Sequence, residues 1–353
     1  MIHTLSYQLG DLIPYVNWIY FFHAWGMPPR FAQVADIHDC VACRREWIAK
    51  MGEADYAQAV EADRLMQEAL GLLRDLDAGW RVKARFGLFP AWSEGEDIVL
   101  LPGVVEAPSG ENLSRQEGAE SFTEKTESGI CPKMVPTGTE AAEFRLPFLR
   151  QQLVRGRQDA CLCLADFIAP KGHFPISATW PSFPVGPETP RGAALGVFVT
   201  AVDRGMEQLY PDDDFRRMLL QTLCDRLAEA AAEKMHEEVR RRYWGYAPDE
   251  HLTPQELFQE KYEGRRPAIG YPSIPDQSMI FLIDRLLGLA DLDIDLTENG
   301  MMIPHAAVSG LMFDHPAARH FSIGRIGREQ FNDYALRRKW TTGEGERYLA
   351  AVL

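Results

Sequence analysis

Residues 265–275 read RRPAIGYPSIP and hold three prolines and one glycine within eleven positions. Proline fixes φ and has no N–H to donate, so this stretch predicts neither a helix nor an inner strand. We expect an ordered, extended loop whose backbone N–H and C=O groups stay free for a ligand. Arg266 adds a planar fork suited to a carboxylate, and Tyr271 adds a ring with a polar tip. The alternative from composition alone is a proline-rich connection in which Arg266 makes a structural salt bridge.

Short motifs accompany this loop on both sides. Those in the second half of the chain are CDRLAEA (224–230), RYWGY (242–246), Glu260, LTE (296–298), AVSG (307–310) and QFNDYA (330–335). Those in the first half are Trp18 with Phe21 and Phe22, GLFPA (87–91), LRQQ (149–152) and LADFIAP (164–170). In this order they resemble the S-adenosylmethionine-binding activation domain of cobalamin-dependent methionine synthase. The resemblance covers nearly the whole chain.

The element pattern favours an α+β fold with an antiparallel sheet and long flanking helices, as in the resembled family. The expected helices cover about 35–77, 213–243 and 277–289, with a last helix beginning near 327. The expected strands lie in 84–100 around a turn at 93–96, and at 160–168, 195–202, 292–297 and 320–327. We interpret residues 1–353 as a single activation domain.

Residues 103–142 differ in composition from the rest of the chain. Pro, Gly, Ser, Glu and Thr dominate there, and large apolar residues are sparse. Such a composition cannot offset the entropy of ordering the chain, so it predicts a flexible insertion within the domain. A second loop, 171–191, also looks extended relative to the resembled family.

Length, charge and composition exclude several classes of protein. The chain has 353 residues, 46% hydrophobic and 25% charged, which is ordinary for a globular protein. Its net charge of −14 argues against a nucleic-acid surface, because phosphate binding needs clustered Lys and Arg. No stretch approaches the roughly 20 apolar residues that span a bilayer, and no signal peptide is evident. We therefore expect no membrane association and a cytoplasmic location.

The resemblance implies a set of ligand-binding residues. The family's positions for S-adenosylmethionine match Glu229, Glu260, Arg266 and Tyr271 here, with Gly270 in the same loop. It implies that Arg266 holds the carboxylate of the ligand and that Glu229 and Glu260 lie near its cationic end. A ligand with a carboxylate, an ammonium and a sulfonium needs such groups beside a flat apolar surface. Taken singly, Glu229 is more often a solvated helix residue and Glu260 a loop charge.

Two departures from the family pattern affect this expected site. Asn17 stands where the family commonly has an aspartate. Its carbonyl can accept from an ammonium, but without the charge we expect binding to weaken by about 1 kcal/mol. His320 and Phe321 stand where the family shows a tyrosine pair. Phe321 keeps a ring without the hydroxyl, and His320 brings a group that titrates near neutral pH.

Cysteine spacing leaves one metal alternative. Cys40 and Cys43 form a C-x-x-C, Cys161 and Cys163 form a C-x-C, and together they could supply the four ligands of a zinc site. A helical run around the first pair favours ordinary packing instead, so we predict no metal site. No Ser-His-Asp spacing, nucleotide-binding glycine loop or Gly-x-Ser-x-Gly elbow appears, and we predict no catalytic side chain.

The resemblance implies a reactivation role in methionine biosynthesis. In that family the domain docks over cobalamin, S-adenosylmethionine supplies a methyl group, and flavodoxin or a similar donor supplies an electron. Inactive cob(II)alamin thereby becomes methylcobalamin, and the domain contributes positioning and exclusion of water.

The length of the chain leaves no room for homocysteine, folate or cobalamin domains. We therefore expect a stand-alone activation subunit, a methyltransferase component inactive alone in homocysteine methylation, whose partner is a separate cobalamin-binding methionine synthase subunit. Two alternatives stay open. One is a non-catalytic docking subunit that binds no S-adenosylmethionine, and the other is a reactivator of a different corrinoid methyltransferase.

Overall fold

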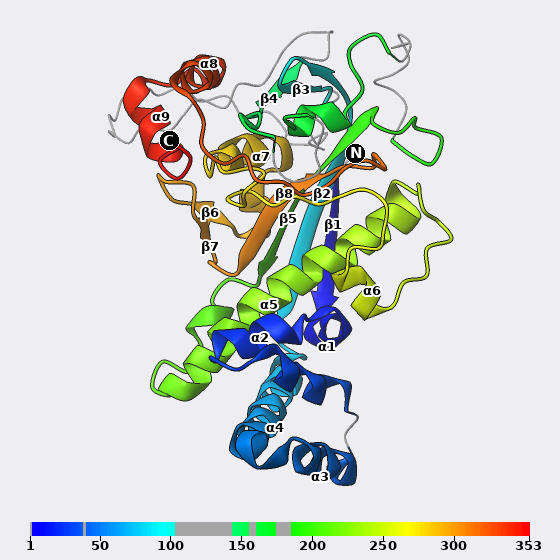
Figure 1. Ribbon diagram of the computed structural model, residues 1–353, viewed down its shortest axis with the longest axis vertical. Helices are drawn as coiled ribbons and strands as arrows, with labels where there is room; N and C mark the ends of the chain where they lie inside the picture. Colours follow the sequence, from blue (N-terminus) through cyan, green and yellow to red (C-terminus); the bar gives the residue numbers. More distant parts are fainter. Residues whose placement is uncertain (1, 38–39, 103–142, 155–159, 174–184) are drawn as a thin grey trace, which may run out of the picture.

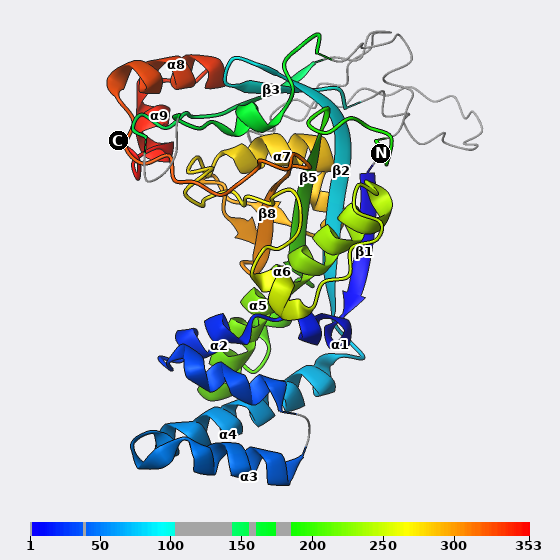
Figure 2. The ribbon, with the colours of Figure 1, turned by 45° about the vertical axis from the view of Figure 1, so that its right-hand side comes forward.

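The computed structural model describes residues 2–37, 40–102, 143–154, 160–173 and 185–353. The predicted insertion at 103–142 lies outside the described residues, as does the middle of the second predicted loop. The molecule is elongated (Figures 1 and 2): helices α3 (Val41–Lys50) and α4 (Gly52–Leu76) form one end. Helices α8 (Arg328–Arg338) and α9 (Thr342–Tyr348) lie at the other end.

The main sheet is antiparallel, which confirms the predicted α+β class. Its strands are β1 (Ile2–Gln8), β2 (Arg81–Glu94), β3 (Asp97–Leu100), β4 (Phe144–Pro147), β5 (Ala194–Val202) and β8 (Ala307–Met312). The strand order is β4-β3-β2-β5-β8, and β1 also pairs with β2. The long strand β2 pairs with β1 along its first half and with β3 at its end. A separate two-stranded sheet joins β6 (Asp295–Leu296) to β7 (Met302–Ile303).

The remaining α-helices lie along this sheet or beside it. They are α1 (Leu9–Leu12), α2 (Trp18–Ala24), α5 (Asp214–Glu238), α6 (Pro254–Phe258) and α7 (Met279–Leu287). Helix α5 crosses one face and shares its core with residues of α1, α2 and α4, while α7 packs on the opposite face (Figure 1). Strand β5 serves both sides: Phe198 and Val202 enter the α5 core, and Val197 and Val199 enter the α7 core.

Local sequence explains why these elements form where they do. All nine residues of β5 are buried, as expected for a continuous apolar run in an inner strand. Helix α5 begins after Asp213, whose side chain accepts a hydrogen bond from the N–H of Arg216 at 2.9 Å. The predicted helix at 35–77 is divided into α3 and α4 at Gly52, which has a φ of +76°.

Two predicted strands are wrong. In 160–168 the segment Leu164–Phe167 is a 3-10 helix, because Asp166 accepts the N–H of Cys163 and closes a turn. Residues 320–327 join no ladder; Ser273 and Pro272 instead bond the backbone N–H groups of Phe321 and Ile323. The strand β1 was not predicted, although Leu5 and Tyr7 alternate with polar neighbours as a half-buried strand requires.

The two longest described helices, α4 and α5, have 25 residues each and carry charges along their length. No helix within the described residues has the apolar character needed to cross a lipid bilayer.

Candidate functional site

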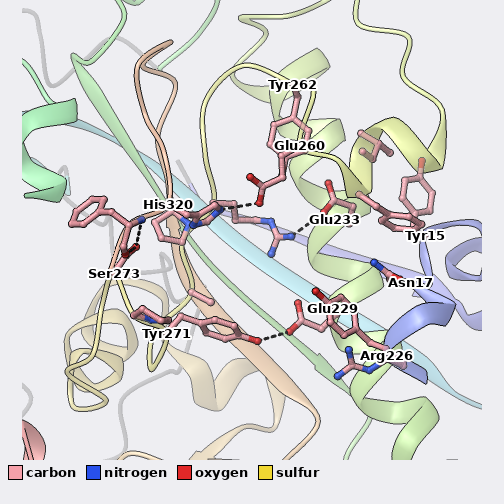
Figure 3. Close-up of a pocket in the computed structure, with 18 of the residues that line it drawn as sticks. Tyr15, Asn17, Arg226, Glu229, Glu233, Glu260, Tyr262, Tyr271, Ser273 and His320 are labelled. Atoms are coloured by element: carbon pink, nitrogen blue, oxygen red, sulfur yellow. Dashed lines mark hydrogen bonds and ion pairs between the residues drawn. The ribbon is translucent and has the colours of Figure 1, made fainter. Parts of the chain in front are cut away.

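A groove of about 760 Å³ lies between α5 and the loop at 265–273, and most of the predicted ligand residues face it (Figure 3). The described residues that line it are Tyr15, Asn17, Tyr20, Arg226, Glu229, Glu233, Leu257, Phe258, Glu260, Tyr262, Arg266, Pro267, Ala268, Tyr271, Pro272, Ser273, His320, Phe321 and Ser322. Seven of the eight predicted residues are among them, and Gly270 is not.

The loop that forms one wall is fastened to the edge of the sheet. Arg265 exchanges two backbone hydrogen bonds with Phe313, both 2.9 Å, and the carbonyl of Pro267 accepts from Leu311 at 3.0 Å. The N–H of Ile269 donates to Ser309 at 2.9 Å. The prediction that this backbone stays free is therefore wrong for alternate residues, because residues 265, 267 and 269 extend the sheet beyond β8. Strand alternation turns the backbone groups of the residues between them away from β8.

Gly270 shapes the loop and does not line the groove. Its φ is +83°, and its N–H donates to the carbonyl of Ile274 at 2.9 Å. A Cβ at this position would lie 2.6 Å from Oε1 of Gln277. Only glycine fits this turn without strain, and the turn is what presents the next residue, Tyr271, to the groove.

Arg266 lines the groove and also makes a salt bridge, so it fits both interpretations of this residue that the sequence left open. Its Nη2 lies 3.1 Å from Oε2 of Glu233 on α5, and only 11% and 12% of the two side chains are exposed. Burial lowers the pKa of Arg266, but the charges of Glu233 and its neighbours outweigh burial and raise it above its ordinary value. Nε of Arg266 and Oε1 of Glu233 are buried without a hydrogen-bond partner. The salt bridge is structural, and each partner still has one polar atom beside the groove that could bond a ligand.

Tyr271 and Glu229 meet across the groove (Figure 3). The hydroxyl of Tyr271 donates to Oε1 of Glu229 at 3.2 Å. The negative charge of Glu229, with burial, raises the pKa of Tyr271, so the phenol remains a neutral donor. This hydrogen bond joins the loop to α5.

His320 and Glu260 form a second pair on the loop side. Nε2 of His320 lies 3.0 Å from Oε1 of Glu260, whose other oxygen lies 3.4 Å from Nε of Arg265. The hydrogen bond from His320 is the main reason that the pKa of Glu260 lies below its ordinary range. Phe321 is only 7% exposed, and its ring packs in the α7 core. It therefore offers the groove no open stacking surface.

Asn17 uses its carbonyl for the protein itself. It is the N-cap of α2, and its Oδ1 accepts the N–H of Ile19 at 3.2 Å. The predicted hydrogen bond from that carbonyl to a ligand ammonium thus competes with the helix cap. With the cap formed, the side chain offers its NH₂ group, which is a donor.

Sequence reasoning missed two charged residues of the groove, Arg226 and Glu233. Both lie on α5 with Glu229, at spacings of three and four residues, which places all three side chains on one helix face. That spacing, which begins within the CDRLAEA motif and continues to residue 233, was the available signal. Among the described residues Arg226 makes no ion pair within 4.0 Å, and its guanidinium lies 5.9 Å from the centre of the Tyr20 ring.

One buried histidine lies behind the groove. His236 is fully buried on α5, and neither of its ring nitrogens has a hydrogen-bond partner. Burial, with the positive charges of Arg240 and Arg266, lowers the pKa of His236 well below its ordinary value. The ring is therefore neutral under physiological conditions.

The two cysteine pairs do not meet. Cys40 caps the N-terminus of α3, at one end of the molecule, whereas Cys163 is buried in the α7 core beside Arg150. The four-cysteine zinc site is therefore wrong. In the described part of the chain, no group of three or more Cys, His, Asp or Glu side chains is arranged to hold a metal ion.

Comparison with known proteins agrees with this geometry. Residues 8–339 match the family model described as vitamin B12 dependent methionine synthase, activation domain. The chain is also similar to the crystal structure of the MetH reactivation domain bound to AdoHcy, with a TM-score of 0.72 and 29% sequence identity. That alignment covers 100% of this chain and 90% of the other. With a family match over almost its full length, this chain belongs to the activation domains of vitamin B12-dependent methionine synthase.

Proposed function

We propose that the groove binds S-adenosylmethionine and that the protein supports reductive methylation of cob(II)alamin to methylcobalamin on a partner corrinoid protein. The observation that carries this proposal is the convergence of seven predicted ligand residues on one groove. The structural relative that carries AdoHcy, the demethylated form of the same ligand, supports the same conclusion.

The groups of the groove fit the chemistry of this ligand. Glu229 and Glu260 are carboxylates suited to an ammonium and a sulfonium, and the buried Nε of Arg266 lacks a partner that a ligand carboxylate would supply. Arg226 offers a second guanidinium on the opposite wall. Tyr20 and Tyr271 are exposed rings that give a sugar or a base an apolar surface.

When bound, S-adenosylmethionine supplies the methyl group that the corrinoid cobalt accepts. The residues of this chain would hold the ligand in one orientation and keep water from its reactive end, which is catalysis by positioning. No step requires a general acid or base from the groove. The partners would be the cobalamin-binding part of methionine synthase, or another corrinoid protein, and a flavodoxin-like electron donor.

The test is a calorimetric titration of the protein with S-adenosylmethionine and, separately, with S-adenosylhomocysteine. We expect saturable one-to-one binding of both, because both contain the carboxylate, the ammonium and the adenosine. Bound ligand should also raise the free energy of unfolding by about 2.7 kcal/mol at a concentration one hundred times Kd. Absence of both heat and thermal stabilisation would contradict the proposal and favour a docking subunit.

To test the role of Arg266, its salt bridge with Glu233 must be removed without leaving either charge buried and unpaired. Arg266→Ala alone leaves the carboxylate of Glu233 buried and unpaired, which costs several kcal/mol of stability. The double variant R266Q/E233Q replaces the ion pair by two neutral amides, so neither charge is left buried and unpaired, and the wild type is its reference. If Arg266 anchors the ligand carboxylate, the double variant binds about 10-fold to 100-fold more weakly than the wild type. Equal binding, with a loss in Arg226→Gln instead, would assign the anchor to Arg226.

A further inference from the structure

The pair of His320 and Glu260 distinguishes one groove carboxylate from the other two. Glu229 meets a neutral phenol, and Glu233 meets the permanent charge of Arg266. Glu260 meets an imidazole, Nε2 to Oε1 at 3.0 Å, and the two side chains are 43% and 40% exposed. Histidine is the side chain whose ordinary titration falls between about pH 5 and pH 8. Glu260 is therefore the groove carboxylate whose ion-pair partner can exist with or without a charge.

We propose that His320 is a specificity-determining residue: through Glu260, its protonation state sets how strongly the groove prefers a cationic sulfonium over the neutral thioether of the same ligand. This inference rests on the proposed function.

The geometry fixes Glu260 in place for this role. The residue has a φ of +53°, in a tight turn just after α6. Its second oxygen faces Nε of Arg265 at 3.4 Å, and Arg265 is itself held by a hydrogen bond from its Nη1 to the carbonyl of Tyr262 at 3.0 Å. The carboxylate thus has one partner of constant charge, Arg265, and one of variable charge, His320, and His320 lines the groove.

The charge of the groove follows from its lining. Three carboxylates and two guanidinium groups among the described lining residues give a formal charge of −1 when His320 is neutral. Protonation of His320 brings this to zero. The other charged or titratable groups that face the pair are Arg265, Arg266, Tyr262 and His236. None of them changes charge in the same range: the arginines stay protonated, burial keeps His236 neutral, and burial raises the pKa of Tyr262.

The two ligands that the proposed function implies differ in one methyl group and the positive charge that it places on sulfur. A groove with net negative charge favours the sulfonium and is indifferent to the thioether. At low pH the imidazolium of His320 neutralises Glu260, and the advantage of the sulfonium shrinks. As pH rises, His320 loses its proton and the charge of Glu260 is no longer neutralised, so the preference for the sulfonium over the thioether grows. Such a groove releases the spent ligand more readily than the methyl donor under neutral or alkaline conditions.

The experiment measures Kd for S-adenosylmethionine and for S-adenosylhomocysteine by calorimetry at constant ionic strength, from about pH 5.5 to about pH 8.5. The quantity of interest is the ratio of the two Kd values. It is compared among the wild type, His320→Gln, which keeps a hydrogen-bond donor without a titrating charge, and Glu260→Gln. Both positions are partly exposed, and circular dichroism checks that the variants are folded. The ligands' own amino groups titrate alike with each protein and cancel in the comparison.

We expect the preference for the sulfonium to rise about twofold to fivefold with pH in the wild type, the range for a partly exposed ion pair. In His320→Gln the preference should stay high and change with pH only through the ligands' own titration. In Glu260→Gln, which keeps His320, the preference should be lower than in the wild type at every pH. A wild-type ratio that follows the same pH course as His320→Gln would overturn the inference while leaving S-adenosylmethionine binding intact. No binding of either ligand at any pH would instead refute the proposed function and the inference with it.

Discussion

The three carboxylates of the groove respond to different variables because each meets a different partner. Glu233 is tied to a guanidinium, so its charge is balanced at every accessible pH. Glu229 accepts from the hydroxyl of Tyr271, which leaves its charge uncompensated. Only Glu260 lies beside a group that ordinarily titrates near neutrality. The electric field in the groove therefore has a constant part, from Glu229 and the Glu233 pair, and a pH-dependent part, from Glu260 and its partner His320.

Asn17→Asp should strengthen binding of S-adenosylmethionine. An aspartate caps α2 as well as asparagine does, and it would keep one oxygen on the N–H of Ile19 while its second oxygen turns to the groove. We expect Kd to fall about fivefold, which is about 1 kcal/mol of added charge-assisted hydrogen bonding. The matched control is Asn17→Ser, which keeps the cap and adds no charge. Equal Kd values for the aspartate variant and the wild type, by calorimetry, would place this side chain outside the ligand's reach.

His236 should make the protein less stable in mild acid. Burial lowers its pKa well below the ordinary 6.5, so below that pH the unfolded chain binds a proton that the folded chain excludes. Above pH 6.5 this histidine does not reduce the free energy of unfolding. Below that pH, the free energy of unfolding falls by about 1.4 kcal/mol for each pH unit. Asp314 acts in the opposite direction, because burial raises its pKa to about 6.

His236→Leu isolates this contribution, because Asp314 is unchanged in the variant. Urea denaturation at about pH 7 and at about pH 5.5 gives the free energy of unfolding of each protein. The wild type should lose stability relative to the variant as pH falls. A difference between them that does not depend on pH would contradict a buried neutral imidazole at this position.

At the scale of elements, the loop at 265–273 depends on one residue that touches no ligand. Gly270→Ala forces a Cβ into a backbone with φ of +83° and to 2.6 Å from Gln277. We expect a loss of at least about 1 kcal/mol of stability and a larger Kd for S-adenosylmethionine, because Tyr271 moves with the turn. The control is Gly71→Ala in α4, where a Cβ meets no atom within 4 Å. That substitution should raise stability by about 0.5–1 kcal/mol and leave Kd unchanged.

How much the sequence could predict depended on whether the signal was local. The helical spacing of 226, 229 and 233 is local, and so is the turn at Gly270, and both are readable from the chain. The pairing of residue 265 with Phe313 is not, because proline at 267 argues against a strand and only the carbonyl of Pro267 is used. The cap made by Asn17 was likewise hidden, since an asparagine before an aromatic run predicts a cap and a ligand contact equally well.

At the scale of the molecule, β2, β5 and β8 give side chains to both the α5 core and the α7 core, which couples the two faces. Leu223 on α5 and Ile283 on α7 are completely buried, one in each core. Replacing either residue by alanine should lower the free energy of unfolding by about 2–5 kcal/mol. If residues 1–353 form a single domain, both variants shift one common unfolding transition, seen alike by tryptophan fluorescence and circular dichroism. Separate transitions, each sensitive to one substitution, would show two independent units.

The attachment of the ligand loop to β8 also bears on solubility. Without the hydrogen bonds of residues 265, 267 and 269, β8 would be an outer strand with a row of unpaired N–H and C=O groups. Such an edge is a template for pairing with a second chain. The segment that shapes the groove therefore also shields the sheet from self-association. Variants whose loop detaches to admit a bulkier ligand should aggregate before their cores lose packing, so solubility limits how far this groove can be remodelled.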